Sequence, residues 1–138
     1  NVIDLMTRII ALCFIILLTG CAKSASFIPD VRVNYSISIQ EFKIRATNNI
    51  LLVPDQGVAG LLIVSTAFGY RAYDRCSSIN PDAKCQITPD EGSITATDPC
   101  SGAKFLLTDG SPAKAPAVRS LKAYTITNQG SQGLHISN

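Results

Sequence analysis

Hydrophobic and polar residues alternate over the first stretch of the chain beyond residue 30. The apolar members of this stretch are Val31, Val33, Tyr35, Ile37 and Ile39, and one polar residue separates each from the next. A period of two places the apolar side chains on one face of an extended strand and the polar side chains on the other. The pattern therefore predicts a half-buried strand over residues 31–39.

Short runs of β-branched or apolar residues continue along the rest of the chain. They occupy residues 50–53, 61–64, 68–73, 86–88, 94–97, 105–107, 121–126 and 134–136. Turn-forming segments rich in Gly, Pro, Asp and Asn separate nearly all of them, at 55–57, 80–82, 89–92 and 109–112. No window keeps a helical spacing of apolar residues over the roughly ten positions that a helix requires. Many short strands joined by turns predict an all-β, antiparallel sandwich or small barrel.

The N-terminal segment carries a separate signal. Residues 9–18 are ten consecutive apolar residues, well short of the roughly 20 residues that span a bilayer. Arg8 precedes this run, and the tetrapeptide at 18–21, Leu-Thr-Gly-Cys, closes it. The arrangement resembles a bacterial signal peptide that ends in a lipobox, where small residues precede a cysteine that becomes lipidated. The alternative is a buried N-terminal strand or helix that ends in Gly-Cys.

The resemblance to a lipobox predicts how the chain divides and where it resides. Residues 1–20 would be the signal peptide, residues 21–30 a short lipidated tether, and residues 31–138 a single globular domain. The expected partner is a membrane in the bacterial cell envelope, bound through a lipid on Cys21. Ala22 follows the cysteine where an Asp often retains lipoproteins in the inner membrane, so outer-membrane attachment is expected.

Charge and histidine content narrow the classes of function. The chain has 12 basic and 10 acidic residues, with no run of like charge that would form an electrostatic stripe. It has a single histidine, His135, and histidine carries much of the acid–base and metal chemistry of enzymes. We therefore expect a protein that is not an enzyme and binds no nucleic acid. In an oxidising envelope compartment, we expect its cysteines to form disulfides rather than to bind a metal.

Two cysteine-containing loops and a proline-containing segment resemble the Rieske iron–sulfur domain. The first loop, 76–85, begins Cys-Ser-Ser and ends in Cys, and the second, 98–105, reads Asp-Pro-Cys-Ser-Gly-Ala-Lys-Phe. The segment 115–124 reads Ala-Pro-Ala, followed by Leu121 and Tyr124. In the Rieske family, a Cys-x-His loop and a Cys-Pro-Cys-His-Gly-Ser-x-Phe loop hold a 2Fe–2S cluster, and a Gly-Pro-Ala-x-x-x-Leu-x-x-Tyr segment covers it. The resemblance implies an antiparallel Rieske-like sandwich with a cluster-binding-like loop subdomain.

The positions that match the cluster ligands are mostly altered. Cys76 matches the first ligand cysteine, whereas Ser78, Asp98 and Ser101 stand where the first histidine, the second cysteine and the second histidine would be. A Rieske centre needs two thiolates and two imidazoles. We therefore expect no cofactor and regard these four residues as vestigial cluster positions. Because buried polar groups need partners, we expect Asp98 to accept backbone N–H bonds or to pair with Arg75.

The remaining cysteines are candidates for a disulfide. Removal of Cys13 and lipidation of Cys21 would leave Cys76, Cys85 and Cys100, fewer than the four thiolates of an all-cysteine cluster. The resemblance implies a Cys85–Cys100 disulfide, because family members often join the two loops at these positions. Such a link would contribute about 3 kcal/mol in the chain-entropy model. The residues alone leave Cys76–Cys85 and Cys76–Cys100 open as well.

Two other kinds of site are weaker candidates. A zinc site built from Cys76, Cys85, Cys100 and either Asp98 or His135 has enough ligands but lacks the Cys-x-x-Cys spacing typical of such sites. The chain contains the serines and the histidine that a hydrolase triad would need. It lacks the Gly-x-Ser-x-Gly motif in which the nucleophilic serine of many hydrolases lies.

These observations support three hypotheses. The preferred one is a membrane-anchored lipoprotein whose degenerate, cluster-less Rieske-like domain acts as a binding or structural module. The second is an electron-transfer protein with a 2Fe–2S Rieske centre, as the family resemblance would imply. The third is a thiol–disulfide redox protein that uses Cys76 with Cys85 and Cys100. An iron assay and the reducibility of the three cysteines distinguish them.

Overall fold

The computed structural model describes residues 1–16 and 28–138. The first helix, α1 (Val2–Ile16), contains most of the apolar run that the sequence predicts as a signal-peptide core. In neither described part is any helix both long enough and apolar enough to cross a bilayer. The predicted lipidation site, Cys21, and most of the predicted tether lie outside the described residues.

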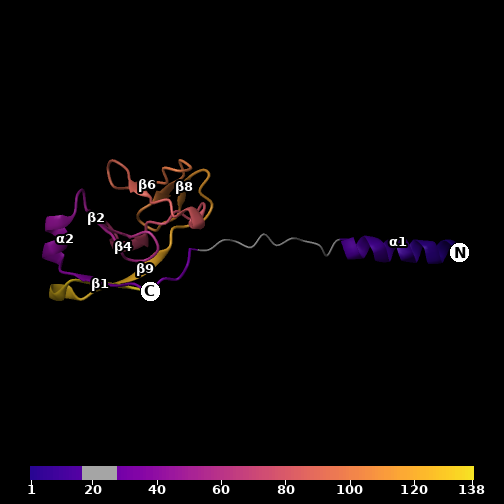
Figure 1. Cartoon of the computed structure of the whole chain (residues 1–138), viewed down its shortest axis with the longest axis horizontal. Helices are drawn as coiled ribbons and strands as arrows, with labels where there is room; N and C mark the ends of the chain where they lie inside the picture. Colours follow the sequence, from indigo (N-terminus) through magenta and orange to yellow (C-terminus); the bar gives the residue numbers. More distant parts are fainter. Residues whose placement is uncertain (17–27) are drawn as a thin grey trace.

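Two antiparallel sheets form the domain (Figure 1). Its elements, in chain order, are β1 (Asn34–Ile37), α2 (Ile39–Arg45), β2 (Ile50–Val53), β3 (Leu61–Thr66), β4 (Gly69–Asp74), the 3₁₀ helix η1 (Pro81–Ala83), β5 (Thr88–Pro89), β6 (Thr95–Thr97), β7 (Lys104–Leu106), β8 (Pro112–Lys114), β9 (Ala123–Asn128), the 3₁₀ helix η2 (Gly130–Gln132) and β10 (Leu134–Ser137). The six-stranded sheet has the order β1-β10-β9-β4-β3-β2, and the four-stranded sheet has the order β5-β6-β7-β8. The predicted all-β, antiparallel architecture is confirmed.

The six-stranded sheet curves so that its two ends share one core. Leu51 and Val53 of β2 lie in the same buried cluster as Leu134 and Ile136 of β10, together with Phe42 of α2. In a flat sheet, β2 and β10 would be separated by four strand spacings of about 4.8 Å each. The sheet therefore closes into a half-barrel around this first core.

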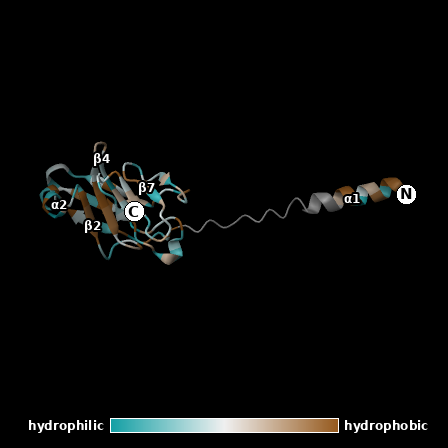
Figure 2. Cartoon of the chain, turned by 90° about the horizontal axis from the view of Figure 1, so that it is seen from above, coloured by the Kyte–Doolittle hydropathy of each residue, from teal (hydrophilic) through white to brown (hydrophobic). Residues whose placement is uncertain are grey.

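A second core lies between the two sheets. Leu62 and Val64 of β3 pack there with Phe105 of β7 and with Leu107. Strand β3 is buried on both faces, which accounts for the unbroken apolar run at 61–64. Figure 2 shows brown, hydrophobic strands within the domain, including β2, and teal, hydrophilic residues in several of the surrounding loops.

One prediction for the start of the domain was wrong. The strand expected over residues 31–39 is shorter, because β1 ends at Ile37 and α2, a helix of seven residues, begins after Ser38. The Glu41 N–H donates to Ser38 Oγ at 3.0 Å, which caps the helix. Ile39 therefore lies in a helix. A capped helix with one buried anchor, Phe42, forms without the long apolar stripe that we required.

The other predicted strands are found, with small shifts at their ends. One strand, β8, was not predicted, because it is short and begins with Pro112. It lies at the edge of the four-stranded sheet, where a proline is tolerated because the outward N–H is not needed for pairing.

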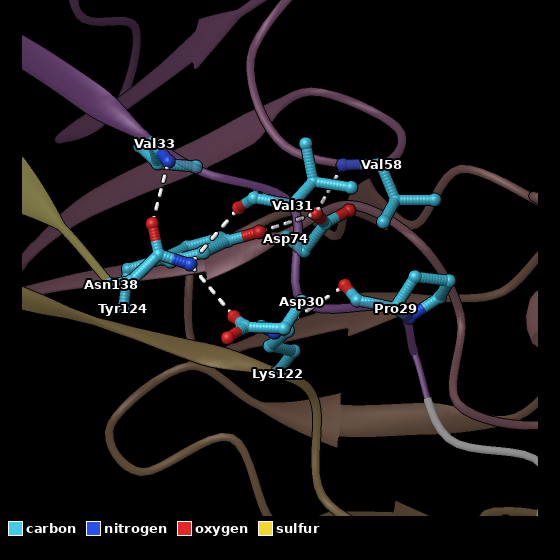
Figure 3. A network of polar contacts seen from close by, with 9 residues as sticks. All are labelled: Pro29, Asp30, Val31, Val33, Val58, Asp74, Lys122, Tyr124 and Asn138. Atoms are coloured by element: carbon cyan, nitrogen blue, oxygen red, sulfur yellow. Dashed lines mark hydrogen bonds and ion pairs between the residues drawn. The ribbon is translucent and has the colours of Figure 1, made fainter.

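The segment before β1 is fastened to the last residue of the domain (Figure 3). The Val33 N–H donates to Asn138 Oδ1 at 2.6 Å, and Asn138 Nδ2 donates to Asp30 at 2.7 Å and to the Val31 carbonyl at 3.0 Å. Lys122 Nζ forms an ion pair with the same Asp30 carboxylate at 2.8 Å. Strand β1 lies at the end of the six-stranded sheet and pairs with β10, so segments from opposite ends of the domain lie side by side there.

Candidate functional site

Two loops of the domain meet at a disulfide. The first loop, residues 75–87, follows β4, and the second, residues 98–103, connects β6 to β7. Cys85 of the first loop is bonded to Cys100 of the second, with their Cα atoms 6.4 Å apart. The disulfide implied by the family resemblance is confirmed. Within the described part of the domain, Cys76 is the free cysteine, and it is buried.

Asp98 is the centre of a buried group of hydrogen bonds between the loops. Its Oδ2 accepts hydrogen bonds from the hydroxyl of Ser77 in the first loop and from the hydroxyl of Ser101 in its own loop, both at 2.7 Å. Its Oδ1 accepts the Cys100 N–H at 2.8 Å. Only 1% of Asp98 is exposed. We call Ser77, Asp98 and Ser101 the loop cluster; it links the two loops beside the disulfide.

The carboxyl group of Asp98 is ionised despite its burial. Burial on its own would raise the pKa of Asp98. The hydrogen bonds from Ser101, from Ser77 and from the backbone outweigh it, so the pKa lies below the ordinary value of 3.8. The loop cluster is therefore built around a negative charge at neutral pH.

The charge on Asp98 is expected to make stability depend on pH. Because the folded pKa lies below the unfolded one, the stabilisation is fully present above the ordinary Asp pKa and is lost as the pH falls through the folded value. Asp98→Asn should therefore cost most near neutral pH, and the difference in unfolding free energy between wild type and variant should shrink below about pH 4. Urea unfolding of both proteins from about pH 7 to about pH 3 measures this difference. A constant difference would contradict the assignment.

Two of the vestigial cluster positions lie outside the loop cluster. Ser78 Oγ donates to the Arg119 carbonyl at 2.8 Å, which ties the first loop to the segment containing Pro116. The Cys76 thiol points toward the Pro81 carbonyl, with 3.5 Å between sulfur and oxygen. Burial raises the pKa of Cys76 to about 11. Of the four positions, Asp98 and Ser101 are hydrogen-bonded to each other, whereas Cys76 and Ser78 bond to backbone carbonyls elsewhere.

The structure shows the first of the two alternatives predicted for Asp98. Asp98 does accept a backbone N–H bond, as expected, but Arg75 does not pair with it. Arg75 Nε donates instead to the Ile87 carbonyl at 3.1 Å, within the first loop. The first loop contacts Asp98 through the Ser77 hydroxyl. Nothing in the sequence marks Ser77 for this contact, because the family pattern allows any residue there.

A second buried carboxylate, Asp74, fixes the start of the first loop (Figure 3). Its Oδ1 accepts the N–H groups of Cys76 at 2.8 Å and Ala59 at 3.1 Å. Its Oδ2 accepts the Val58 N–H and the Tyr124 hydroxyl, both at 2.7 Å. Asp74 is completely buried. It therefore holds the loop before β3, the cysteine loop and β9 in one fixed arrangement.

Tyr124 connects the segment 115–124 to this carboxylate. Burial and the hydrogen bond to Asp74 raise the pKa of the Tyr124 phenol, so the hydroxyl stays protonated and donates. Gly57 has φ of +63° and lies so close that a β-carbon there would collide with the Asp74 carboxylate and the Tyr124 hydroxyl. The same segment contains a cis peptide bond between Ala115 and Pro116.

The groups around the two loops differ from the donor set of a 2Fe–2S Rieske centre. Atoms of Cys85, Asp98 and Cys100 lie within 4.8 Å of one another, but the two sulfurs are bonded to each other. The positions that match cluster ligands hold one buried thiol, two hydroxyls and one carboxylate. Rieske centres need two thiolates and two imidazoles. The single histidine, His135, lies on β10, where its Nδ1 is 2.8 Å from Ser36 Oγ.

Comparison with solved structures identifies the fold. The chain is similar to the plasma membrane Rieske protein PetC3 from the cyanobacterium Synechocystis PCC 6803, with a TM-score of 0.56 and 21% identity over 78% of this chain and 98% of that chain. It is similar to a chain in the complex of reduced oxygenase and oxidized ferredoxin in carbazole 1,9a-dioxygenase, with a TM-score of 0.53 and 16% identity over 78% of this chain and 94% of that chain. The ferredoxin of carbazole 1,9a-dioxygenase from Nocardioides aromaticivorans IC177 gives a TM-score of 0.50 and 17% identity over 78% of this chain and 94% of that chain.

No family model and no curated protein matches the chain. At the identities of the structural neighbours, the likeness concerns the fold alone. The domain therefore has a Rieske-like fold, as the loop motifs predicted.

Proposed function

We propose that the chain is a membrane-anchored lipoprotein whose Rieske-like domain is a binding or structural module and does not carry electrons. The observation that carries this proposal is the loop cluster. Asp98 stands at the position of a ligand cysteine, and its two oxygens accept three hydrogen bonds from Ser77, Ser101 and Cys100. The bond from Ser77 joins the two loops together with the disulfide, which is the task that a bridging cluster performs in a Rieske centre, and the bonds from Ser101 and Cys100 hold Asp98 in its own loop.

Two alternative functions have weaker support. The fold favours electron transfer, because the neighbours include a Rieske protein and a ferredoxin. The donor groups oppose it, because the single histidine lies on β10 and the thiol of Cys76 is buried. Cys76 also argues against a thiol redox role. With a pKa of about 11, its thiol is almost entirely protonated at neutral pH, and the thiolate is the reactive form.

Iron content and colour test the proposal. The full chain, purified in detergent from iron-replete cells, is expected to be colourless and to contain far less than the two irons per chain that a Rieske centre holds. The Synechocystis Rieske protein, expressed in the same cells, controls for cluster assembly. A brown preparation of this chain with about two irons would refute the proposal.

The proposed anchor is a diacylated Cys21. It is supported by the apolar run at 9–18 and by the Leu-Thr-Gly-Cys sequence that closes it. Two acyl chains give stable membrane binding, whereas one gives only marginal binding. Only about a dozen residues separate Cys21 from the first strand, β1, so the anchor would hold the domain near the bilayer. With Ala22 after the cysteine, we place the protein at the outer membrane of the bacterial envelope.

Cys21→Ser is expected to abolish acylation and to leave residues 1–20 attached. The serine hydroxyl cannot form the thioether that precedes signal removal. Intact mass and incorporation of labelled palmitate into the purified chain measure both effects. Cys13→Ser is the matched control, because Cys13 lies inside the apolar run and should not be modified. Normal acylation of the Cys21→Ser protein would exclude this anchor.

A further inference from the structure

Two edge strands of the domain border one groove. The sheet orders place β2 at the end of the six-stranded sheet and β5 at the end of the four-stranded sheet. A groove of about 600 Å³ lies between them, with walls from β2, from β5 and the turn after it, and from the end of α2. Ser93 Oγ donates to the Asn48 carbonyl at 2.7 Å and fixes the turn against the start of β2. This volume is in the range of ordinary ligand pockets.

The outer edge of β2 offers backbone groups to the groove. The Ser65 N–H donates to the Asn49 carbonyl at 3.0 Å. Because residues that exchange backbone hydrogen bonds alternate along an antiparallel pair, Leu51 and Val53 also face β3. The N–H and the carbonyl of Leu52 therefore face away from β3.

Leu52 is the available position on this edge. The preceding outward residue, Ile50, already exchanges backbone hydrogen bonds with Thr47 at 3.0 and 2.9 Å. Leu52 is 38% exposed, whereas the other residues of β2 are buried. Leu52 lines the groove and presents both an apolar side chain and two backbone groups.

The outward edge of β5, across the groove, offers a backbone carbonyl but no N–H group. The Asp90 N–H donates to the Thr95 carbonyl at 2.9 Å, so by the same alternation Pro89 faces away from β6. Proline has no N–H group. The two edges thus present two carbonyls and one N–H, which suits an occupant with its own backbone N–H groups.

The charges of the groove favour an occupant that carries a basic residue. Asp90 is held by Lys104 Nζ at 2.8 Å, and Arg45 is paired with Glu41 at 2.9 Å. Glu91 is exposed and has no partner within residues 28–138. The Glu91 carboxylate therefore gives the groove a negative charge that a basic residue of an occupant could pair with.

We propose that this groove binds an extended segment of a partner protein, with an apolar residue on Leu52 and a basic residue beside Glu91. The segment would add one strand to the six-stranded sheet, a common mode of peptide recognition. Self-association of the domain through the same groove is the alternative that the test below must exclude. The proposed peptide site does not depend on whether the two cysteine-containing loops bind a 2Fe–2S cluster.

Synthetic peptides test the proposal. The probe is acetylated, amidated Thr-Val-Lys-Val-Thr-Val, and the matched peptide has Glu in place of Lys. With the full chain in detergent micelles, the Lys peptide should shift the amide NMR signals of Leu52 and Glu91 and slow hydrogen exchange at Leu52. It should bind about tenfold more tightly than the Glu peptide. Glu91→Lys should reverse this preference, and Phe68→Lys, an exposed residue outside the groove lining, should leave it unchanged.

A second measurement modifies the peptide and leaves the protein unchanged. N-methylation of alternate amides removes the donors on one edge of the Lys peptide and should abolish binding, while methylation of the other amides should be tolerated. The proposal is overturned if no groove signal shifts at about 1 mM peptide, or if the shifts lie only in the disulfide loops. It is also overturned if Leu52 signals change through self-association in the absence of peptide.

Discussion

Asp74→Ala is expected to lower the free energy of unfolding by about 4 kcal/mol, a large part of the stability of a small domain. The substitution leaves the Tyr124 hydroxyl and three backbone N–H groups without their acceptor in a completely buried site. Each unsatisfied buried donor costs roughly 1–3 kcal/mol, and local rearrangement reduces the sum. Urea unfolding of the full chain, followed by circular dichroism, measures the loss.

Two further variants define the size of this effect. Tyr124→Phe removes one of the four donors and should cost about 1 kcal/mol. Asp82→Ala removes an exposed carboxylate from η1 and should change stability by less than about 0.5 kcal/mol. If Asp74→Ala cost no more than Tyr124→Phe, the three N–H bonds would contribute nothing measurable.

Replacing both Cys85 and Cys100 by alanine is expected to cost about 3 kcal/mol. The two cysteines are 15 residues apart in sequence, so the unfolded chain loses a closed loop of that size. The double substitution leaves no new thiol behind. Guanidinium unfolding measures the loss, and reduction of the wild-type disulfide should give a similar value.

The disulfide and the loop cluster join the same two loops, so their effects are expected to be non-additive. Once the disulfide is removed, residues 98–103 are held less firmly, and Asp98→Ala should then cost less than it does in the oxidised protein. A double-mutant cycle over the two changes measures the coupling. Additive losses would mean that the two links act independently.

The strands could be predicted from the sequence because burial determines where the apolar residues fall. A strand with one buried face has an apolar residue at every second position, and a strand buried on both faces has an unbroken apolar run. The run at 61–64 is apolar throughout because β3 is buried on both sides. The end of β1 was misplaced because alternation continues through Ile39, while the local capping signal is stronger. Ser38 followed by Glu41 three residues later is the capping pattern that would have revealed α2.

The site could be predicted only as far as a loop motif determines which segments meet. The motif gave the partners Cys85 and Cys100 and marked Asp98 as a buried acceptor. It did not show that Ser77, and not Arg75, turns toward Asp98. Side-chain direction in an irregular loop depends on tertiary contacts, such as the bond from the Cys76 N–H to Asp74. The groove could not be foreseen either, since the order of strands in the two sheets decides which edges lie side by side.

The ribosome makes β1 early, yet the partner strand of β1 is made much later. Ser36 and His135, which lie opposite each other in the pair, are 99 residues apart. At about 5–20 residues per second, β1 waits for roughly 5–20 seconds. During that time the half-barrel cannot close, because Leu134 and Ile136 complete its core. The core of the half-barrel is therefore completed only after the last strand, β10, has been synthesised.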